Sequence, residues 1–122
     1  MNKQDLKART KLFAINTIHF VNSLPKTKSN DVISYQILKS ATSVAANYRA
    51  SLRGRSTAEF ISKLNIVLEE ADESMFWFEI IEATNDNLNS EKLKILLKES
   101  NELTAIFTAS ILTAKKNLKS KI

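Results

Sequence analysis

Cysteine is absent from this 122-residue sequence, and glycine and proline occur once each, as Gly54 and Pro25. Without cysteine the chain can form no disulfide and no thiolate zinc site, which is typical of a reducing compartment and favours a cytoplasmic location. A β-sandwich or barrel of this length needs many more turn-forming residues. The composition therefore predicts an all-α protein, and the length predicts a single domain over residues 1–122.

Long apolar runs are also missing. No uninterrupted apolar stretch approaches the roughly 20 residues that a membrane helix requires. The first residues, MNKQDLKARTKLFAIN, mix acidic, basic and amide side chains before any apolar run, unlike a signal peptide. We expect neither a signal peptide nor a membrane span.

The sequence has too little histidine and glycine for the common catalytic arrangements. His19 is the only histidine, and we expect it at the surface because it lies off the apolar stripe of its segment. The richest carboxylate cluster, Glu69, Glu70, Asp72 and Glu73, lacks the Glu-x-x-His motifs of carboxylate-bridged metal sites in helix bundles. One glycine cannot build a Gly-rich phosphate loop, and one histidine without cysteine supports no nucleophilic triad. We expect no metal, no cofactor, no small-molecule substrate and no enzymatic activity.

Four amphipathic segments fill most of the chain, at about residues 5–22, 31–52, 57–84 and 91–118. Their apolar residues recur at helical spacing, and the loops between them are short, the first of them around Pro25. Such a chain predicts an antiparallel up-down-up-down four-helix bundle. Outside the third segment, the predicted core residues are Leu6, Phe13, Thr17, Phe20, Leu24, Ile33, Ile37, Ala41, Val44, Tyr48, Leu52, Leu93, Leu96, Leu97, Leu103, Phe107, Ile111, Ala114 and Leu118.

Short-range signals predict where the helices begin and end. Ser56 and Glu59 have the S-x-x-E spacing of a capping box, so the third helix should start at about Thr57. Gly54 lies where a helix C-terminus favours a left-handed residue. The predicted caps of the second and fourth helices are Asn30 or Ser29, and Ser90.

The segment 57–84 carries more large apolar side chains than one core-facing stripe holds. A helical wheel places a second set well away from that stripe, on a face shared with acidic residues, which predicts exposed apolar surface and self-association. The alternative is that long side chains of the neighbouring helices bury this face. The core stripe is Phe60, Leu64, Val67, Leu68, Ala71, Met75 and Phe78, and the second set is Ile66, Phe76, Trp77 and Ile80.

Charge is unevenly distributed along the chain. Residues 1–55 hold ten basic and two acidic residues, residues 56–91 hold one and nine, and residues 92–122 hold seven and two. Arg53 and Arg55 precede the positive N-terminal end of the third helix, which makes a candidate phosphate-binding corner. The alternative is a solvated polar face with salt bridges between subunits. The candidate phosphate contacts are Lys39, Arg49, Arg53 and Arg55, extended by Lys26 and Lys28 and by the tail residues Lys115, Lys116, Lys119 and Lys121.

The stretch from about Gln36 to Ile80 resembles the four-helix-bundle proteins encoded within intervening sequences of bacterial 23S ribosomal RNA genes. The matching elements are Asn47, Arg55-Ser56-Thr57 leading into Ala58-Glu59-Phe60, and Glu70-Ala71-Asp72-Glu73 before the aromatic run, with LPK at Leu24 to Lys26 similar to the family's first turn. Many members continue the asparagine as Asn-Ile-Ala-Glu-Gly. Here Tyr48, Arg49, Ala50 and Ser51 follow instead, so no role of the missing Glu and Gly is transferred.

This resemblance implies a left-handed antiparallel bundle that assembles into a ring-like pentamer with a basic surface or channel. It also implies nucleic-acid binding, since related proteins accompany the reverse transcriptases of diversity-generating retroelements. We therefore expect a non-catalytic homo-oligomer that binds structured RNA, or RNA and DNA, through its basic residues. The alternative is a protein-interaction scaffold that engages a partner such as a reverse transcriptase without touching nucleic acid.

Overall fold

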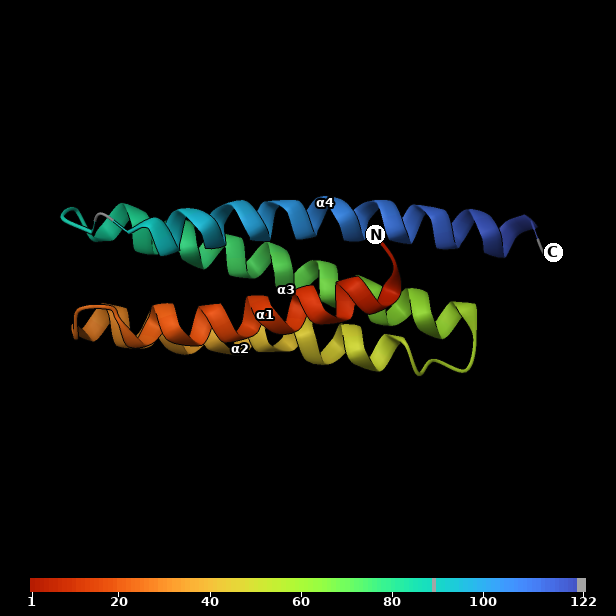
Figure 1. The fold of residues 1–122 in the computed structure, drawn as a ribbon, viewed down its shortest axis with the longest axis horizontal. Helices are drawn as coiled ribbons and strands as arrows, with labels where there is room; N and C mark the ends of the chain where they lie inside the picture. The colour runs from red at the N-terminus through yellow and green to blue at the C-terminus, as the bar shows by residue number, and fades with distance from the viewer. Residues whose placement is uncertain (89, 121–122) are drawn as a thin grey trace.

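The computed structural model describes residues 1–88 and 90–120, and these form four long helices. Consecutive helices run in opposite directions, and each packs against the next (Figure 1). No strand occurs in the described ranges, and none of the helices there is long and apolar enough to cross a membrane. The all-α class and the number of helices are confirmed. The helices are α1 (Lys3–Asn22), α2 (Lys28–Ser51), α3 (Thr57–Thr84) and α4 (Glu91–Ser120).

Helix α2 begins earlier than the sequence predicted, because its cap is Thr27 and neither Ser29 nor Asn30. The Thr27 hydroxyl accepts a hydrogen bond from the Asn30 backbone amide at 3.1 Å. The Asn30 side chain is buried, and its amide nitrogen donates to the Pro25 carbonyl at 2.9 Å and to the Asn85 side chain at 3.0 Å. Asn30 therefore ties two loops together instead of capping a helix.

The prediction for Gly54 is wrong, because no glycine of the described chain has a positive φ. Helix α2 ends at Ser51, and the Gly54 amide donates to the Ser51 carbonyl at 3.1 Å. A Cβ atom at position 54 would lie 3.2 Å from the Ser51 oxygen and 3.4 Å from the Phe60 nitrogen. The glycine is therefore explained by the close approach of α3 to this loop.

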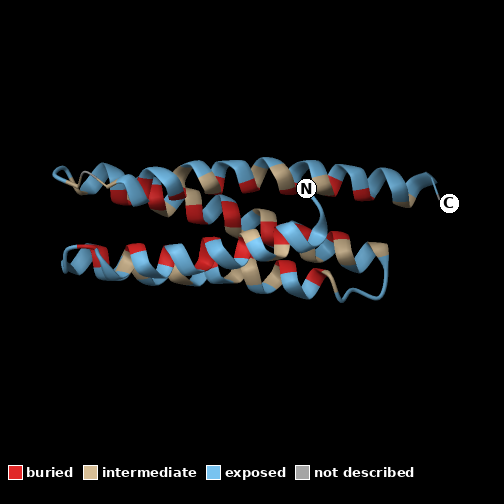
Figure 2. Cartoon of the chain, in the orientation of Figure 1, coloured by how far each residue is buried: buried red, intermediate tan, exposed pale blue. Residues whose placement is uncertain are grey.

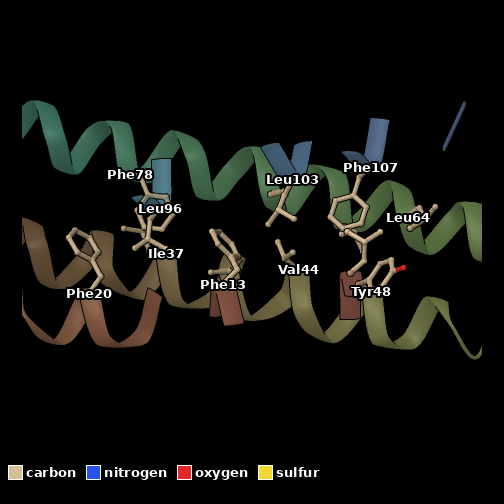
Figure 3. Close-up of a cluster of buried hydrophobic side chains, with 14 of the residues drawn as sticks. Phe13, Phe20, Ile37, Val44, Tyr48, Leu64, Phe78, Leu96, Leu103 and Phe107 are labelled. Atoms are coloured by element: carbon tan, nitrogen blue, oxygen red, sulfur yellow. The ribbon is translucent and has the colours of Figure 1, made fainter. Parts of the chain in front are cut away.

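Buried residues recur along all four helices, and their side chains form one continuous core (Figure 2). Near its middle, the Phe78 ring meets Phe13 and Phe20 edge-on, with ring centroids 6.2 and 6.0 Å apart. The Tyr48 ring packs on Phe107 at 5.4 Å further along the core (Figure 3). Edge-to-face pairs of this kind add to the stabilisation from burial.

The predicted core of α1 is confirmed, since every residue of its stripe is buried. In α3 the buried stripe is rotated slightly from the prediction, because the side of α3 that packs on α2 also lies within the core. There Ser74 donates a hydrogen bond to the Ser40 hydroxyl at 2.9 Å. The predicted residues Phe60, Leu68 and Met75 are half-buried, and Ile61, Ser74 and Ile81 are buried in their place; Ile33, Leu52, Leu97 and Leu118 of the other helices are also only half-buried.

Helices α1 and α4 close the bundle loosely, because α1 contacts α2 far more extensively than it contacts α4. Arg9 bridges this seam with two hydrogen bonds to the Glu99 carboxylate, from Nε at 2.8 Å and from Nη2 at 2.6 Å. Paired bonds between a guanidinium and a carboxylate are strong and fix geometry. They raise the pKa of Arg9 and hold α1 to α4 where side-chain packing is sparse.

Candidate nucleic-acid interface

The fold separates the basic residues that the sequence grouped. Lys26 and Lys28 lie at the turn between α1 and α2, whereas Arg53 and Arg55 lie in the connection between α2 and α3. These two connections are at opposite ends of the bundle (Figure 1). Lys39 lies between them on α2, close enough to Glu70 of α3 to oppose in part the burial that raises the pKa of that carboxyl. The predicted set is therefore not one site.

One end of the bundle gathers most of the unpaired positive charge, and we call it the basic end. It consists of residues 1–8 at the start of α1, 46–63 around the α2–α3 connection, and 109–120 at the end of α4. These segments contain nine basic and two acidic residues. The basic residues are Lys3, Lys7, Arg49, Arg53, Arg55, Lys63, Lys115, Lys116 and Lys119, while Lys121 lies outside the described residues.

Helix direction supports this charge distribution. Helices α2 and α4 both end here, with Arg49 in the last turn of α2 and Lys119 in the last turn of α4. Cations are favourable beside the partial negative charge of a helix C-terminus. Arg49, Arg53, Lys115 and Lys116 are exposed, so this charge is available to a ligand.

The two acidic residues of the basic end, Asp5 and Glu59, accept hydrogen bonds from backbone amides at helix N-termini. The Asp5 carboxylate accepts from the Asn2 amide at 3.3 Å, and the Glu59 carboxylate accepts from the Arg55 amide at 2.8 Å. Half of the predicted capping box is therefore confirmed, because the Ser56 hydroxyl accepts a hydrogen bond from the Glu59 backbone amide. The other half differs, because the Glu59 carboxylate accepts from the backbone amide of Arg55 and not from that of Ser56. Because Glu59 brings negative charge to the start of α3, a phosphate would have to meet arginine side chains there rather than the helix N-terminus.

The opposite end differs in charge and in closure, and we call it the closed end. It consists of residues 18–34, 80–88 and 90–95, which contain four basic and four acidic residues. Asn30 and Asn85 exchange two side-chain hydrogen bonds, at 3.0 and 3.2 Å, and Asn85 also donates to the Ile81 carbonyl at 2.9 Å. His19, on the last turn of α1, is exposed as predicted.

The second apolar set of α3 is only partly at the surface. Phe76 is 50% exposed and Ile66 is 36% exposed, whereas Trp77 and Ile80 are half-buried. Trp77 packs against the core and meets the Phe76 ring at 4.9 Å, and its indole nitrogen is buried without a hydrogen-bond partner in the described chain. The exposed patch is therefore smaller than predicted, because the Trp77 side chain packs against the core.

The acidic residues of α3 have no ion-pair partner within the described residues, where the ion pairs involve Glu91, Glu99 and Glu102 of α4. Burial raises the pKa of Glu70, and the neighbouring carboxylate of Glu73 adds to this. The Ser43 hydroxyl and Lys39 act in the opposite direction. The acidic residues of α3 thus carry negative charge that no ion pair within the described residues neutralises.

Sequence reasoning missed the exposed apolar side chains along the α1–α4 seam. Leu12 and Ile95 are more than half exposed and line a shallow groove of about 340 Å³ together with the hydrocarbon and polar parts of Asn16 and Lys98. The sequence contained an indication of this surface, since Leu12 is a large apolar residue that lies off the buried stripe of Phe13 and Phe20. No group of three or more potential metal-ligating side chains occurs in the described ranges.

The fold and the charge distribution define a small all-α protein, a bundle of four long helices with one strongly basic end. The chain belongs to the family described as 23S rRNA-intervening sequence protein, whose model matches residues 2–109. The resemblance drawn from the sequence is confirmed. The last turns of α4 lie beyond the matched residues.

A solved structure shares this fold. It is the crystal structure of a protein of unknown function from the S23 ribosomal protein family of Bacteroides thetaiotaomicron VPI-5482. The two chains are 32% identical, with a TM-score of 0.81 over 91% of this chain and 98% of the other. No curated protein matches the chain.

Proposed function

We propose that this protein is a non-catalytic nucleic-acid-binding protein that contacts the phosphates of structured RNA, or of RNA and DNA, through its basic end. The observation that carries the proposal is the gathering of nine basic residues from three separate segments at one end, against two acids already bound to backbone amides. Phosphate contacts supply most of the sequence-independent affinity for nucleic acids.

The assignment narrows the set predicted from the sequence. Arg49, Arg53 and Arg55 stay phosphate contacts and are joined by Lys115, Lys116 and Lys119. Lys26 and Lys28 are not part of the interface, because they lie at the closed end, where acidic residues balance them. The family's description, which refers to a sequence within 23S ribosomal RNA, is consistent with an RNA ligand.

A salt titration with two matched double variants tests the proposal. Wild-type affinity for a structured RNA should fall steeply between low and physiological salt, because binding releases counterions. The Arg53→Ala, Arg55→Ala variant should bind about tenfold more weakly and show a shallower salt dependence, whereas Lys26→Ala, Lys28→Ala should match the wild type. Equal losses in both double variants, or a flat salt response, would reject the basic end as the interface.

We further propose that the protein acts as a ring of identical subunits. Two different apolar surfaces are exposed: Ile66 and Phe76 on α3, and Leu12 and Ile95 on the α1–α4 seam. Joining two unlike surfaces gives a head-to-tail contact instead of a two-fold dimer, and such contacts form a ring where the rotation between subunits closes. The unpaired acids of α3 and the excess basic residues elsewhere supply charge complementarity. The family resemblance implies five subunits and a left-handed bundle.

Light scattering at micromolar concentration tests this association. Phe76→Ala should lower the measured mass with little change in the Tm, because the Phe76 side chain is half exposed in one subunit. Leu112→Ala is the matched control, since Leu112 is 64% exposed but lies near the end of α4. A wild-type protein that is monomeric at this concentration would end the ring proposal.

A second candidate function is a protein-interaction scaffold that engages a partner such as a reverse transcriptase. The exposed apolar seam of α1 and α4 favours it, because apolar surface of this kind binds protein more readily than phosphate. If RNA affinity does not change with salt concentration while light scattering shows a stable oligomer, the scaffold function is favoured over nucleic-acid binding.

A further inference from the structure

At the basic end, the bundle opens into a groove beside the start of α1. The groove has a volume of about 510 Å³, within the ~300–1,000 Å³ range of small-molecule sites. Its walls come from the start of α1, the first turns of α3 and the last turns of α4, and its apolar lining includes Phe60, Leu64 and Ile106. Most of its α4 side lies beyond residue 109, outside the family match.

Three hydrogen-bonding side chains that line this groove have no partner in the described chain: Tyr48, Thr113 and Asn117. Tyr48 is only 2% exposed, yet its hydroxyl makes no hydrogen bond there. Figure 3 shows this hydroxyl directed away from Phe107, toward the end of the bundle where α3 begins. The Tyr48 hydroxyl oxygen still reaches the groove, and the Thr113 and Asn117 side chains are exposed, so all three can bond to a ligand there in place of water.

The groove also presents an aromatic face. The Lys3 ammonium lies 4.8 Å from the centroid of the Phe60 ring and covers it as a cation. A planar ligand can replace this contact by stacking on the ring, while Lys3 moves to a nearby anion. The other lysine and arginine residues of the basic end provide further positive charge at this end of the bundle.

We propose that this groove receives one unpaired base of a bound RNA, a role that rests on the proposed function of the basic end. The base stacks on Phe60, as bases do on aromatic side chains in single-strand binding proteins. Tyr48, Thr113 and Asn117 bond to its polar edge, and the surrounding lysine and arginine side chains hold the flanking phosphates. Burial raises the pKa of Tyr48, which keeps the hydroxyl protonated as a donor.

The test uses a single-stranded RNA of about eight nucleotides that carries one fluorescent 2-aminopurine. Binding to wild type should quench this fluorescence, because the base stacks. Tyr48→Phe, which removes only the hydroxyl, should weaken binding about threefold to fivefold, and Asn117→Ala should do the same. Asn101→Ala is the matched control, since it changes an exposed asparagine of α4 away from the groove. The same RNA with an abasic site in place of the fluorescent base should bind about tenfold more weakly.

The outcomes separate this proposal from the one on which it rests. If wild type binds the RNA with a steep salt dependence but Tyr48→Phe, Asn117→Ala and the abasic site change nothing, the phosphate interface stands and the base pocket is overturned. If Tyr48→Phe alters the oligomer mass and leaves RNA affinity unchanged, the groove receives a second subunit, and the base pocket is again overturned. If no RNA binds, the proposed function fails first. Thermal unfolding of each variant confirms that the fold is intact.

Discussion

The two ends of the bundle satisfy their polar groups in opposite ways. At the closed end, Asn30 is 3% exposed, and its amide is fully used between the Pro25 carbonyl and Asn85. At the basic end, Tyr48 is buried to a similar degree, but its hydroxyl has no partner within the described residues and reaches the open groove. The closed end therefore satisfies this side chain within the chain, whereas the basic end leaves a hydroxyl free for the proposed base.

Charge follows the same division. The closed end balances four basic residues with four acidic ones, while the basic end has a surplus of seven positive charges, from nine basic and two acidic residues. The comparison teaches that total charge is a poor guide to a binding site, because the fold decides which charges meet. The α4 tail and the α2–α3 connection are about 60 residues apart in sequence and come to the same end only because the helices alternate in direction.

The largest expected difference between the ends concerns aromatic burial. Phe78 is fully buried against Phe13 and Phe20, so Phe78→Ala should lower the free energy of unfolding by about 3–5 kcal/mol. Phe60→Ala at the basic end should cost less than about 2 kcal/mol, because that ring is half-buried beside the open groove. Urea unfolding of both variants measures the difference. An equal decrease in the free energy of unfolding for both variants would mean that the basic end is packed as tightly as the rest of the core.

The next difference concerns hydrogen bonds. Asn30→Ala should cost about 2 kcal/mol, since it removes the hydrogen bonds of a buried side chain to Pro25 and Asn85 and leaves their partly buried groups without these partners. Tyr48→Phe should change stability by less than about 1 kcal/mol, because the hydroxyl makes no bond to lose. Chemical denaturation with Asn65→Ala, an exposed asparagine of α3, as the control checks the pair. A cost for Tyr48→Phe as large as that for Asn30→Ala would contradict an open groove.

The smallest effect lies between the ends, on α3. Burial raises the pKa of Glu70, so the folded state binds a proton more tightly than the unfolded state, and stability falls as pH rises from the ordinary pKa of 4.5 through the raised folded value. Glu70→Gln should therefore raise the free energy of unfolding at pH 7, and with it the Tm, by less than about 1 kcal/mol of free energy, because solvent screens a half-buried carboxyl. This gain should vanish as the pH drops below the ordinary value. Glu69→Gln, at an exposed neighbouring site, serves as the control in the same thermal melts.

Periodic features were predictable from sequence, because the helical repeat of buried residues such as Phe13, Phe20 and Phe107 requires only local information. The separation of Lys26 and Lys28 from Arg53 also followed from the predicted alternation of helix direction, which puts consecutive connections at opposite ends, but grouping the basic residues as one set overlooked it. The role of Asn30 was missed because its partner Asn85 is 55 residues away. A single glycine was also misread, because steric contact with Phe60 explains Gly54 better than backbone handedness.

The measurement that tests the central claim most directly is photo-crosslinking of the protein to a single-stranded RNA, followed by mass spectrometry of the crosslinked peptides. The account predicts crosslinks in residues 1–8, 46–63 and 109–120 at the basic end, lost together at high salt. Crosslinks concentrated at the α1–α2 turn around Lys26 and Lys28 would contradict it.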